Sequence, residues 1–114
     1  MNRLVVGALT ATLIAGSAAA QVPPLAYNAK IFTAVDTVSV QNTTVLVTGI
    51  VQGEAAPSTW AVRAYSSTEA TAWAAICQRS ALLAMSKPGQ YLLEIQYLSS
   101  TYGGSVCKLS RVTP

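Results

Sequence analysis

Five short stretches of the chain have the composition of β-strands, some of them with alternating hydrophobic and polar residues, and apolar residues recur at helical spacing along one longer stretch. Alternation indicates a half-buried β-strand, whereas recurrence every three to four positions indicates an amphipathic helix. The predicted strands are residues 30–40, 43–51, 60–65, 91–97 and 106–112. The predicted helix lies between the third and the fourth of them.

The second stretch, TTVLVTGIV, is the clearest strand. Both of its faces are apolar, which is typical of a central strand with neighbours on either side. Gly49 interrupts the run, and a glycine inside a strand indicates a bulge or a bend. The apolar residues are Val45, Val47 and Val51 on one face and Leu46 and Ile50 on the other.

Ser66 and Glu69 fit the S-x-x-E capping box, so we expect Ser66 to be the N-cap of the helix, with Glu69 three positions inside it. Lys87 falls in the last turn, and Pro88-Gly89 ends the helix. The expected inward face consists of Trp73, Ile76, Cys77, Ser80 and Ala84, widened by Ala81 and Leu83.

The order strand, strand, strand, helix, strand, strand predicts a mostly β, α+β fold. Two architectures fit this order: a small five-stranded OB-like barrel, or an open sheet with the helix packed on it. In the barrel, the face of the helix that carries Trp73 would close one end. In the fourth strand, one face is expected to carry Tyr91, Leu93, Ile95 and Tyr97.

The N-terminus has the pattern of a secretory signal peptide: Arg3, an apolar run over residues 4–15, and the small residues Ala18 to Ala20. We therefore divide the chain into a signal peptide (1–20), an extended leader (21–29) and a single OB-like domain (30–114). The alanine-rich signal favours a bacterial protein that is exported to the periplasm or the medium. No stable membrane insertion is expected after cleavage, because no second apolar run of spanning length follows.

Cys77 and Cys107 are the only cysteines, so only one pairing exists. An exported chain meets an oxidising compartment, which favours a structural disulfide. A redox-active pair is usually more closely spaced, as in C-x-x-C.

The composition is 52% hydrophobic and 10% charged, and histidine is absent. These values exclude a disordered charged chain, Ser-His-Asp or Cys-His catalysis, and histidine-dependent metal sites. We predict no metal and no cofactor. After removal of residues 1–20, six cations and four carboxylates leave a net charge of +2, scattered along the chain, so nucleic acid is not an expected partner.

Four carboxylates remain as candidates for acid–base chemistry: Asp36, Glu54, Glu69 and Glu94. A glycosidase needs two of them facing each other, and no pattern in the sequence brings a pair together. A serine nucleophile would need a base, and the sequence holds no histidine to act as one. We therefore expect no enzymatic activity.

Aromatic residues are the remaining candidates for a binding site. Trp73 is expected in the core, and Trp60 is expected to be half exposed. Tyrosine at a strand end combines an apolar ring with a polar tip, which suits sugars and peptides. The predicted ligand-binding residues are Arg63, Tyr65, Tyr97 and Tyr102.

Residues 43–112 resemble, in general plan, the B subunits of bacterial AB5 toxins, which are small secreted OB-fold proteins with one helix in the same place. The best part of the resemblance is residues 77–97, CQRSALLAMSKPGQYLLEIQY: a helix, a glycine turn and an alternating strand. The same helix–glycine–strand–cysteine ending is similar to that of short secreted bacterial proteins of unassigned function. The resemblance to B subunits implies a ring-forming subunit that binds glycans.

The sequence therefore leads to two functional hypotheses. The first is a secreted, non-catalytic binding module whose ligand is a glycan or a protein surface. The second is a structural or envelope accessory protein that self-associates through a sheet edge into a homo-oligomer.

Overall fold

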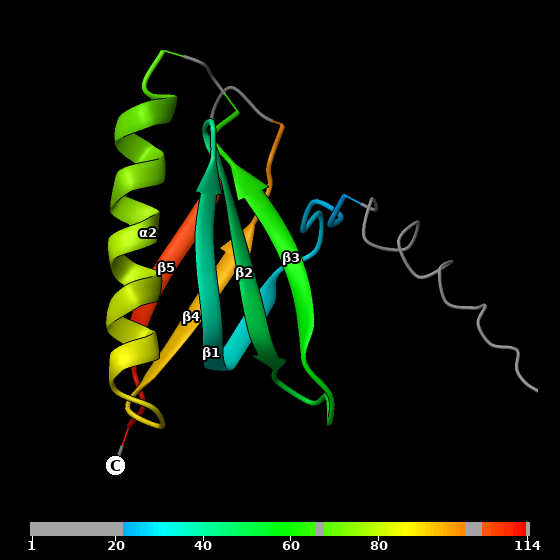
Figure 1. Cartoon of the computed structure of the whole chain (residues 1–114), viewed down its shortest axis with the longest axis vertical. Coiled ribbons are helices and arrows are strands. Elements are labelled where there is room, and N and C mark those ends of the chain that lie inside the picture. Colours follow the sequence, from blue (N-terminus) through cyan, green and yellow to red (C-terminus); the bar gives the residue numbers. More distant parts are fainter. Residues whose placement is uncertain (1–21, 66–67, 100–103, 114) are drawn as a thin grey trace, which may run out of the picture.

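The computed structural model describes residues 22–65, 68–99 and 104–113 (Figure 1). The prediction of five strands with one helix between the third and the fourth is confirmed, and the fold is mostly β and OB-like. The elements are β1 (Lys30–Gln41), β2 (Thr44–Val51), β3 (Ser58–Arg63), α2 (Ala70–Ser86), β4 (Tyr91–Gln96) and β5 (Val106–Arg111).

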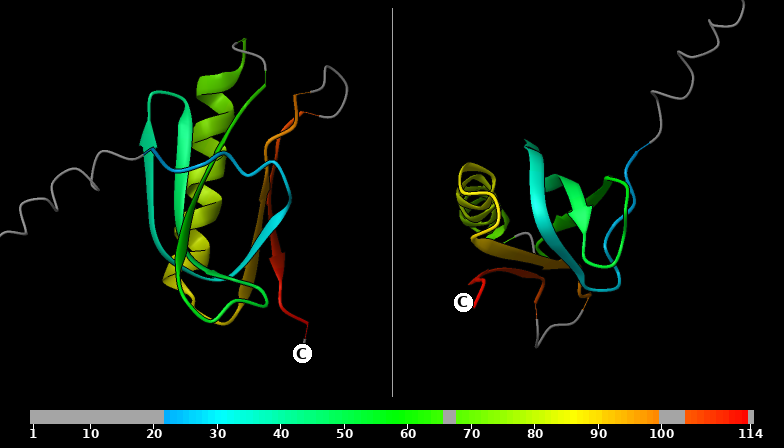
Figure 2. Two further views of the ribbon diagram at one scale, coloured as in Figure 1. Left: turned by 90° about the vertical axis from the view of Figure 1, so that its right-hand side faces the viewer. Right: turned by 90° about the horizontal axis from the view of Figure 1, so that it is seen from below.

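All five strands belong to one antiparallel sheet in the order β3-β2-β1-β4-β5. β1 joins the two halves of this sheet, because residues 30–32 pair with β4 while residues 32–41 pair with β2. Two register shifts, after Phe32 and after Val35, interrupt the pairing with β2. Such irregularities bend a strand and increase its twist, and the sheet accordingly curls, with α2 lying along its side (Figure 2).

Gly49 lies opposite Val35, where the register between β1 and β2 shifts. A Cβ atom on Gly49 would collide with the carbonyl oxygen of Ala34. The expectation that this glycine marks a bend is therefore confirmed, and the cause is a close approach of two backbones. β2 is also central as predicted, with β1 on one side and β3 on the other.

The third strand differs from its predicted range of 60–65. It begins at Ser58 and ends at Arg63, so Tyr65 lies beyond the strand. The reason is the pairing with β2, which begins at Thr44, opposite Arg63, and offers no partner to later residues.

The helix also begins later than predicted. Glu69 is the N-cap of α2 instead of its third residue, and its side chain makes no capping hydrogen bond. Ser66 lies outside the described residues. Packing explains the start, because Ala70 is the first buried residue of the helix, whereas Glu69 is exposed. The helix ends at Ser86, before Pro88-Gly89 as predicted, but Lys87 is its C-cap and not a residue of the last turn.

The inward face of α2 is narrower than predicted. Cys77, Ala81 and Ala84 face the core as expected, but Ile76 is 58% exposed and Leu83 is 38% exposed. Trp73 is partly buried against the core. Small side chains allow the helix to approach the sheet closely, so alanines take the contact and the bulkier residues lie at its margin. The buried residues of α2 are Ala70, Ala74, Cys77, Ala81 and Ala84.

The core lies between this helix face and the curled sheet. The predicted face of β4 is confirmed: Leu93 and Ile95 are fully buried, and Tyr91 and Tyr97 pack against them from the margin. The largest fully buried side chains are Phe32, Leu93, Ile95, Val45, Val47, Val62 and Cys77.

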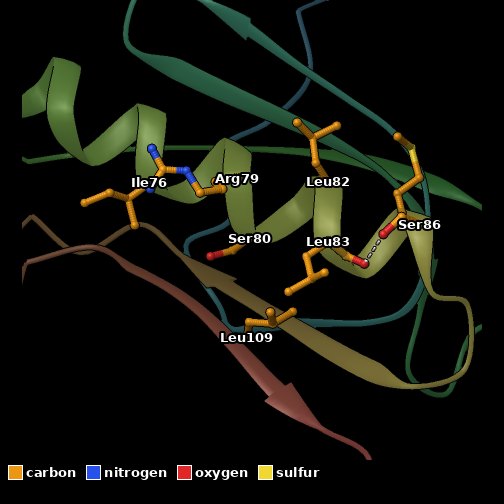
Figure 3. A pocket seen from close by; sticks show the side chains of 8 residues that line it. Ile76, Arg79, Ser80, Leu82, Leu83, Ser86 and Leu109 are labelled. Atoms are coloured by element: carbon orange, nitrogen blue, oxygen red, sulfur yellow. Dashed lines mark hydrogen bonds between the residues drawn. The ribbon is translucent and has the colours of Figure 1, made fainter.

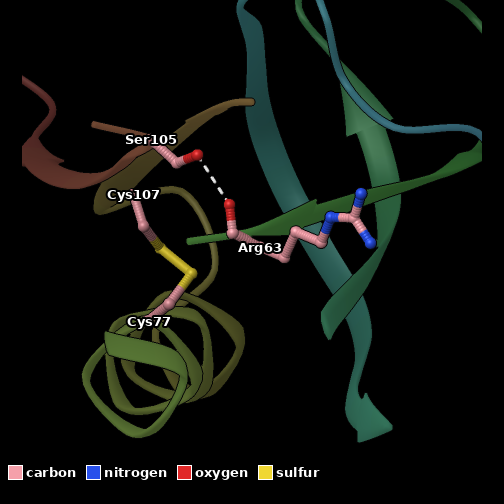
Figure 4. The surroundings of a disulfide bond; sticks show 4 residues. All are labelled: Arg63, Cys77, Ser105 and Cys107. Carbon is pink, nitrogen blue, oxygen red and sulfur yellow. Dashed lines mark hydrogen bonds between the residues drawn. A yellow bond between two sulfur atoms is a disulfide. The ribbon is translucent and has the colours of Figure 1, made fainter. Parts of the chain in front are cut away.

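The disulfide between Cys77 and Cys107 is present and joins α2 to β5, with 5.5 Å between the Cα atoms (Figure 4). It closes a loop with a sequence separation of 30 residues. In the chain-entropy model, such a loop stabilises the fold by about 3–4 kcal/mol.

The segment that precedes β1 is hydrogen-bonded to β3 and to the residue that follows β4. The Ala26 N–H donates to the Ala61 carbonyl and the Ala61 N–H donates to the Pro24 carbonyl, each at 2.8 Å. The Tyr97 N–H, just after β4, donates to the Ala26 carbonyl at 2.7 Å. The Ala26 side chain is fully buried. Residues 24–26 therefore connect the β3 edge to the end of β4.

Within the described residues, no helix combines the length and the hydrophobicity that a membrane crossing requires.

Candidate binding site

Three side chains from distant parts of the sequence meet where the leader, β3 and β4 come together. The rings of Tyr27 and Tyr97 pack edge to face, with 5.6 Å between their centroids. The guanidinium carbon of Arg63 lies 5.4 Å from the centroid of the Tyr97 ring. We call Tyr27, Arg63 and Tyr97 the tyrosine–arginine cluster.

Backbone contacts position each member of this cluster. Arg63 is the last residue of β3, and its carbonyl accepts a hydrogen bond of 2.6 Å from the Ser105 hydroxyl (Figure 4). The same hydroxyl accepts a bond of 3.3 Å from the Leu98 N–H, just after Tyr97. Ser105, the residue before β5, thus connects the ends of β3 and β4.

The leader is held in the same way. The Gln96 side chain donates to the Tyr27 carbonyl at 3.2 Å. Together with the bond from Tyr97 to Ala26, this contact fixes the backbone from which the Tyr27 ring projects. The cluster is therefore preorganised by main-chain contacts, and its polar tips remain available to a ligand.

The cluster is open to solvent. Tyr27 is 64% exposed and Arg63 is exposed, whereas Tyr97 is half-buried beneath them. The half-buried Tyr97 ring supports both the Arg63 guanidinium and the exposed Tyr27 ring. Together they form a surface with an apolar face and fixed hydrogen-bond donors. Cation–π contact of this kind orients the guanidinium and reduces its freedom.

The structure thus brings together two of the four predicted binding residues, Arg63 and Tyr97. Tyr65 is 45% exposed and follows Arg63 by two residues. Tyr102 lies outside the described residues. Tyr27 was missed because it belongs to the predicted leader; the signal for it was an aromatic residue three positions before the first strand.

A second cation–π pair lies on the other side of β3. The Lys30 Nζ atom is 4.0 Å from the centroid of the Trp60 ring, and the Trp60 N–H donates to the Ser58 hydroxyl at 3.2 Å. Because Trp60 and Arg63 are three positions apart on one strand, they point to opposite faces. Trp60 is half-buried and packs against the core, so this pair covers the core margin.

The carboxylates do not form a metal site in the part of the chain that the structure describes, where no three His, Cys, Asp or Glu side chains gather. The four acidic residues lie on β1, in the β2–β3 loop, before α2 and on β4.

Comparisons with protein-family models, with curated proteins and with solved structures found no match for this chain.

Proposed function

We propose that this protein is an exported, non-catalytic binding module that holds a glycan on the tyrosine–arginine cluster. One observation carries the proposal: an exposed tyrosine ring, a supporting ring and an arginine are fixed on one surface by main-chain hydrogen bonds. Export is supported by the signal-like N-terminus and by the disulfide, which is typical of oxidising compartments.

The chemistry of the cluster suits a sugar. The C–H groups of a pyranose ring can pack on the exposed Tyr27 ring, as apolar surfaces do on aromatic faces. The Arg63 guanidinium presents several donors in a rigid plane, which fits vicinal hydroxyls or a carboxylate. Binding requires little ordering, because Tyr97 already holds the arginine in place.

The resemblance to toxin B subunits supports the same reading and adds an assembly: a ring in which several copies present their sites together. Weak single-site binding would then be raised by multivalency. Native mass spectrometry of the oxidised protein, processed after residue 20, tests this assembly independently of the ligand.

A glycan array followed by titration of each hit tests the function. We expect Tyr27→Ala to weaken binding about tenfold, because a ring contact of about 1.4 kcal/mol is lost. Arg63→Gln should weaken it at least as much, since charge-assisted donors disappear. Neither change should alter the thermal unfolding midpoint by more than a few degrees, because both side chains are exposed.

Lys108→Gln is the matched control, because Lys108 is an exposed cation on β5 and lies outside the cluster. It should leave glycan affinity unchanged. A silent array would contradict the proposal, as would hits whose affinity is the same in the Tyr27→Ala and Arg63→Gln variants.

A further inference from the structure

A groove with a volume of about 630 Å³ runs between the second half of α2 and β5, away from the tyrosine–arginine cluster (Figure 3). Leu83 of the helix and Leu109 of the strand point toward one another across it. Ile76 and Leu82 remain 58% and 43% exposed at its walls. Uncovered aliphatic side chains that line a hollow are typical of a docking surface. The apolar lining consists of Ile76, Leu82, Leu83, Met85 and Leu109.

β5 is the last strand of the sheet and has β4 as its neighbour on one side, with no strand on the other among the described elements. The Val112 N–H donates to the Gln90 carbonyl at 2.9 Å, at the end of the β4–β5 ladder. Along a strand of an antiparallel ladder, the N–H and C=O groups of successive residues point alternately toward the paired strand and away from it, and those of Val112 point toward β4. The N–H and C=O groups of Cys107, Leu109 and Arg111 therefore point away from β4, toward the open edge.

The side chains of these residues also share one face of β5. Cys107 is bonded to Cys77 of α2, so this face is the one turned to the helix. Leu109 accordingly lines the groove, and Arg111 lies on the same face at its end. An open strand edge and an apolar groove thus run side by side, which is the arrangement that β-strand addition requires.

The charges around this groove are positive. Arg79 lines it, Arg111 lies at its end, and Lys87 directly follows the helix. Among the described residues that line the groove there is no carboxylate. Glu94 of β4 pairs with Lys108 of β5, and both side chains lie on the other face of the sheet. A second copy that docked through the same groove would bring these like charges together, which disfavours that mode of self-association.

We infer that the open edge of β5 binds an extended, acidic segment of a partner protein, which adds a strand to the sheet. Every second side chain of this segment faces the groove. An apolar side chain packs between Leu83 and Leu109, and a carboxylate two positions away meets Arg111. This interaction goes beyond the proposed glycan binding and uses a separate surface.

Two end-blocked heptapeptides test the inference: Thr-Glu-Thr-Val-Thr-Val-Thr for antiparallel addition and its reverse sequence for parallel addition. Each is titrated into the ¹⁵N-labelled, oxidised full chain up to about 1 mM, where even weak association is visible. We expect one of them to bind, and the amide protons of Cys107, Leu109 and Arg111 to gain protection from exchange. Replacing glutamate by lysine in the peptide should weaken binding about tenfold.

Protein variants separate the two parts of the site. Leu109→Pro removes an N–H that the fold does not use, and should abolish binding while the β4–β5 ladder remains. The double variant Ile76→Ser/Leu83→Ser keeps the edge but removes the apolar walls, and should weaken binding at least tenfold. Since both side chains are already exposed, this variant remains informative if Leu109→Pro fails to fold. Lys108→Gln is the control and should bind normally.

The inference is overturned if neither peptide binds at 1 mM, or if binding leaves the three edge amides unprotected. It is also overturned if ultracentrifugation shows a dimer that the Ile76→Ser/Leu83→Ser variant dissociates, because a second copy would then occupy the groove. Retention by vesicles of phosphatidylglycerol that the same variant abolishes would assign the groove to a lipid surface instead. None of these outcomes depends on the glycan experiment.

Discussion

At the scale of single residues, the sheet depends on a position where no side chain fits. Gly49 lies where β1 bends, and the space that a Cβ atom would take is filled by the Ala34 carbonyl. The glycine in TTVLVTGIV indicated a bend in the sequence, but not which backbone approaches it. That neighbour follows from the shifted register between β1 and β2.

We predict that Gly49→Ala destabilises the protein by about 2–4 kcal/mol, because the backbones must separate or the ladder must break. Gly53→Ala is the comparison. Gly53 has φ +88°, but a Cβ atom there meets nothing within 4 Å. Gly53→Ala should therefore destabilise the protein by only about 1 kcal/mol, from backbone strain. Urea unfolding followed by circular dichroism measures both. Equal destabilisation by the two substitutions would contradict the proposed collision.

At the scale of elements, the position of α2 is decided by small side chains. Helical periodicity in the sequence identified a face that includes Cys77, Ala81 and Ala84, and these residues are buried. It also assigned Ile76 and Leu83 to that face, although Ile76 is 58% exposed and Leu83 is 38% exposed. Hydrophobicity alone favours the burial of isoleucine over alanine. A close contact between helix and sheet instead favours small side chains, because large ones do not fit between them.

This packing predicts that stability is sensitive to substitution at Ala81 and nearly insensitive to it at Ile76. Ala81→Leu should destabilise the protein by about 1–3 kcal/mol, because Ala81 is fully buried and the larger side chain forces α2 from the sheet. Ile76→Ala should change stability by less than about 0.5 kcal/mol, since this side chain is mostly exposed. Thermal unfolding under oxidising conditions compares the two. A larger effect at Ile76 than at Ala81 would contradict the burial of the alanine side chains against the sheet.

At the scale of the whole molecule, residues 24–26 connect edge strand β3 of a curled sheet to the end of β4. Three backbone hydrogen bonds and the buried Ala26 side chain tie this segment to Ala61 and to Tyr97. The proline pair in the sequence indicated an extended leader, and nothing in its local pattern indicated partners more than 30 residues away. The same contacts place Tyr27 beside Tyr97, so they also build the candidate binding site.

We predict that a chain beginning at Asn28 is less stable than one beginning at Gln21 by about 3 kcal/mol, from three lost hydrogen bonds at about 1 kcal/mol each. The amides of Ala61 and Tyr97 should lose their protection from hydrogen exchange. Val22→Ser, at an exposed position, serves as the control and should have no effect. Unchanged protection in the shortened chain would refute a structural role for the segment.

The sequence by itself determined the order of the elements, the central position of β2 and the pairing of Cys77 with Cys107. These features depend on local periodicity, on turn residues and on there being only two cysteines. Only the tertiary structure decided which stripe of α2 is buried and which side chains meet at the surface. Arg63 and Tyr97 were candidates from their residue types, but their contact with each other and with Tyr27 arises from the curling of the sheet. The bend in β1 and the long-range hydrogen bonds of the leader produce that curling, and neither leaves a periodic pattern in the sequence.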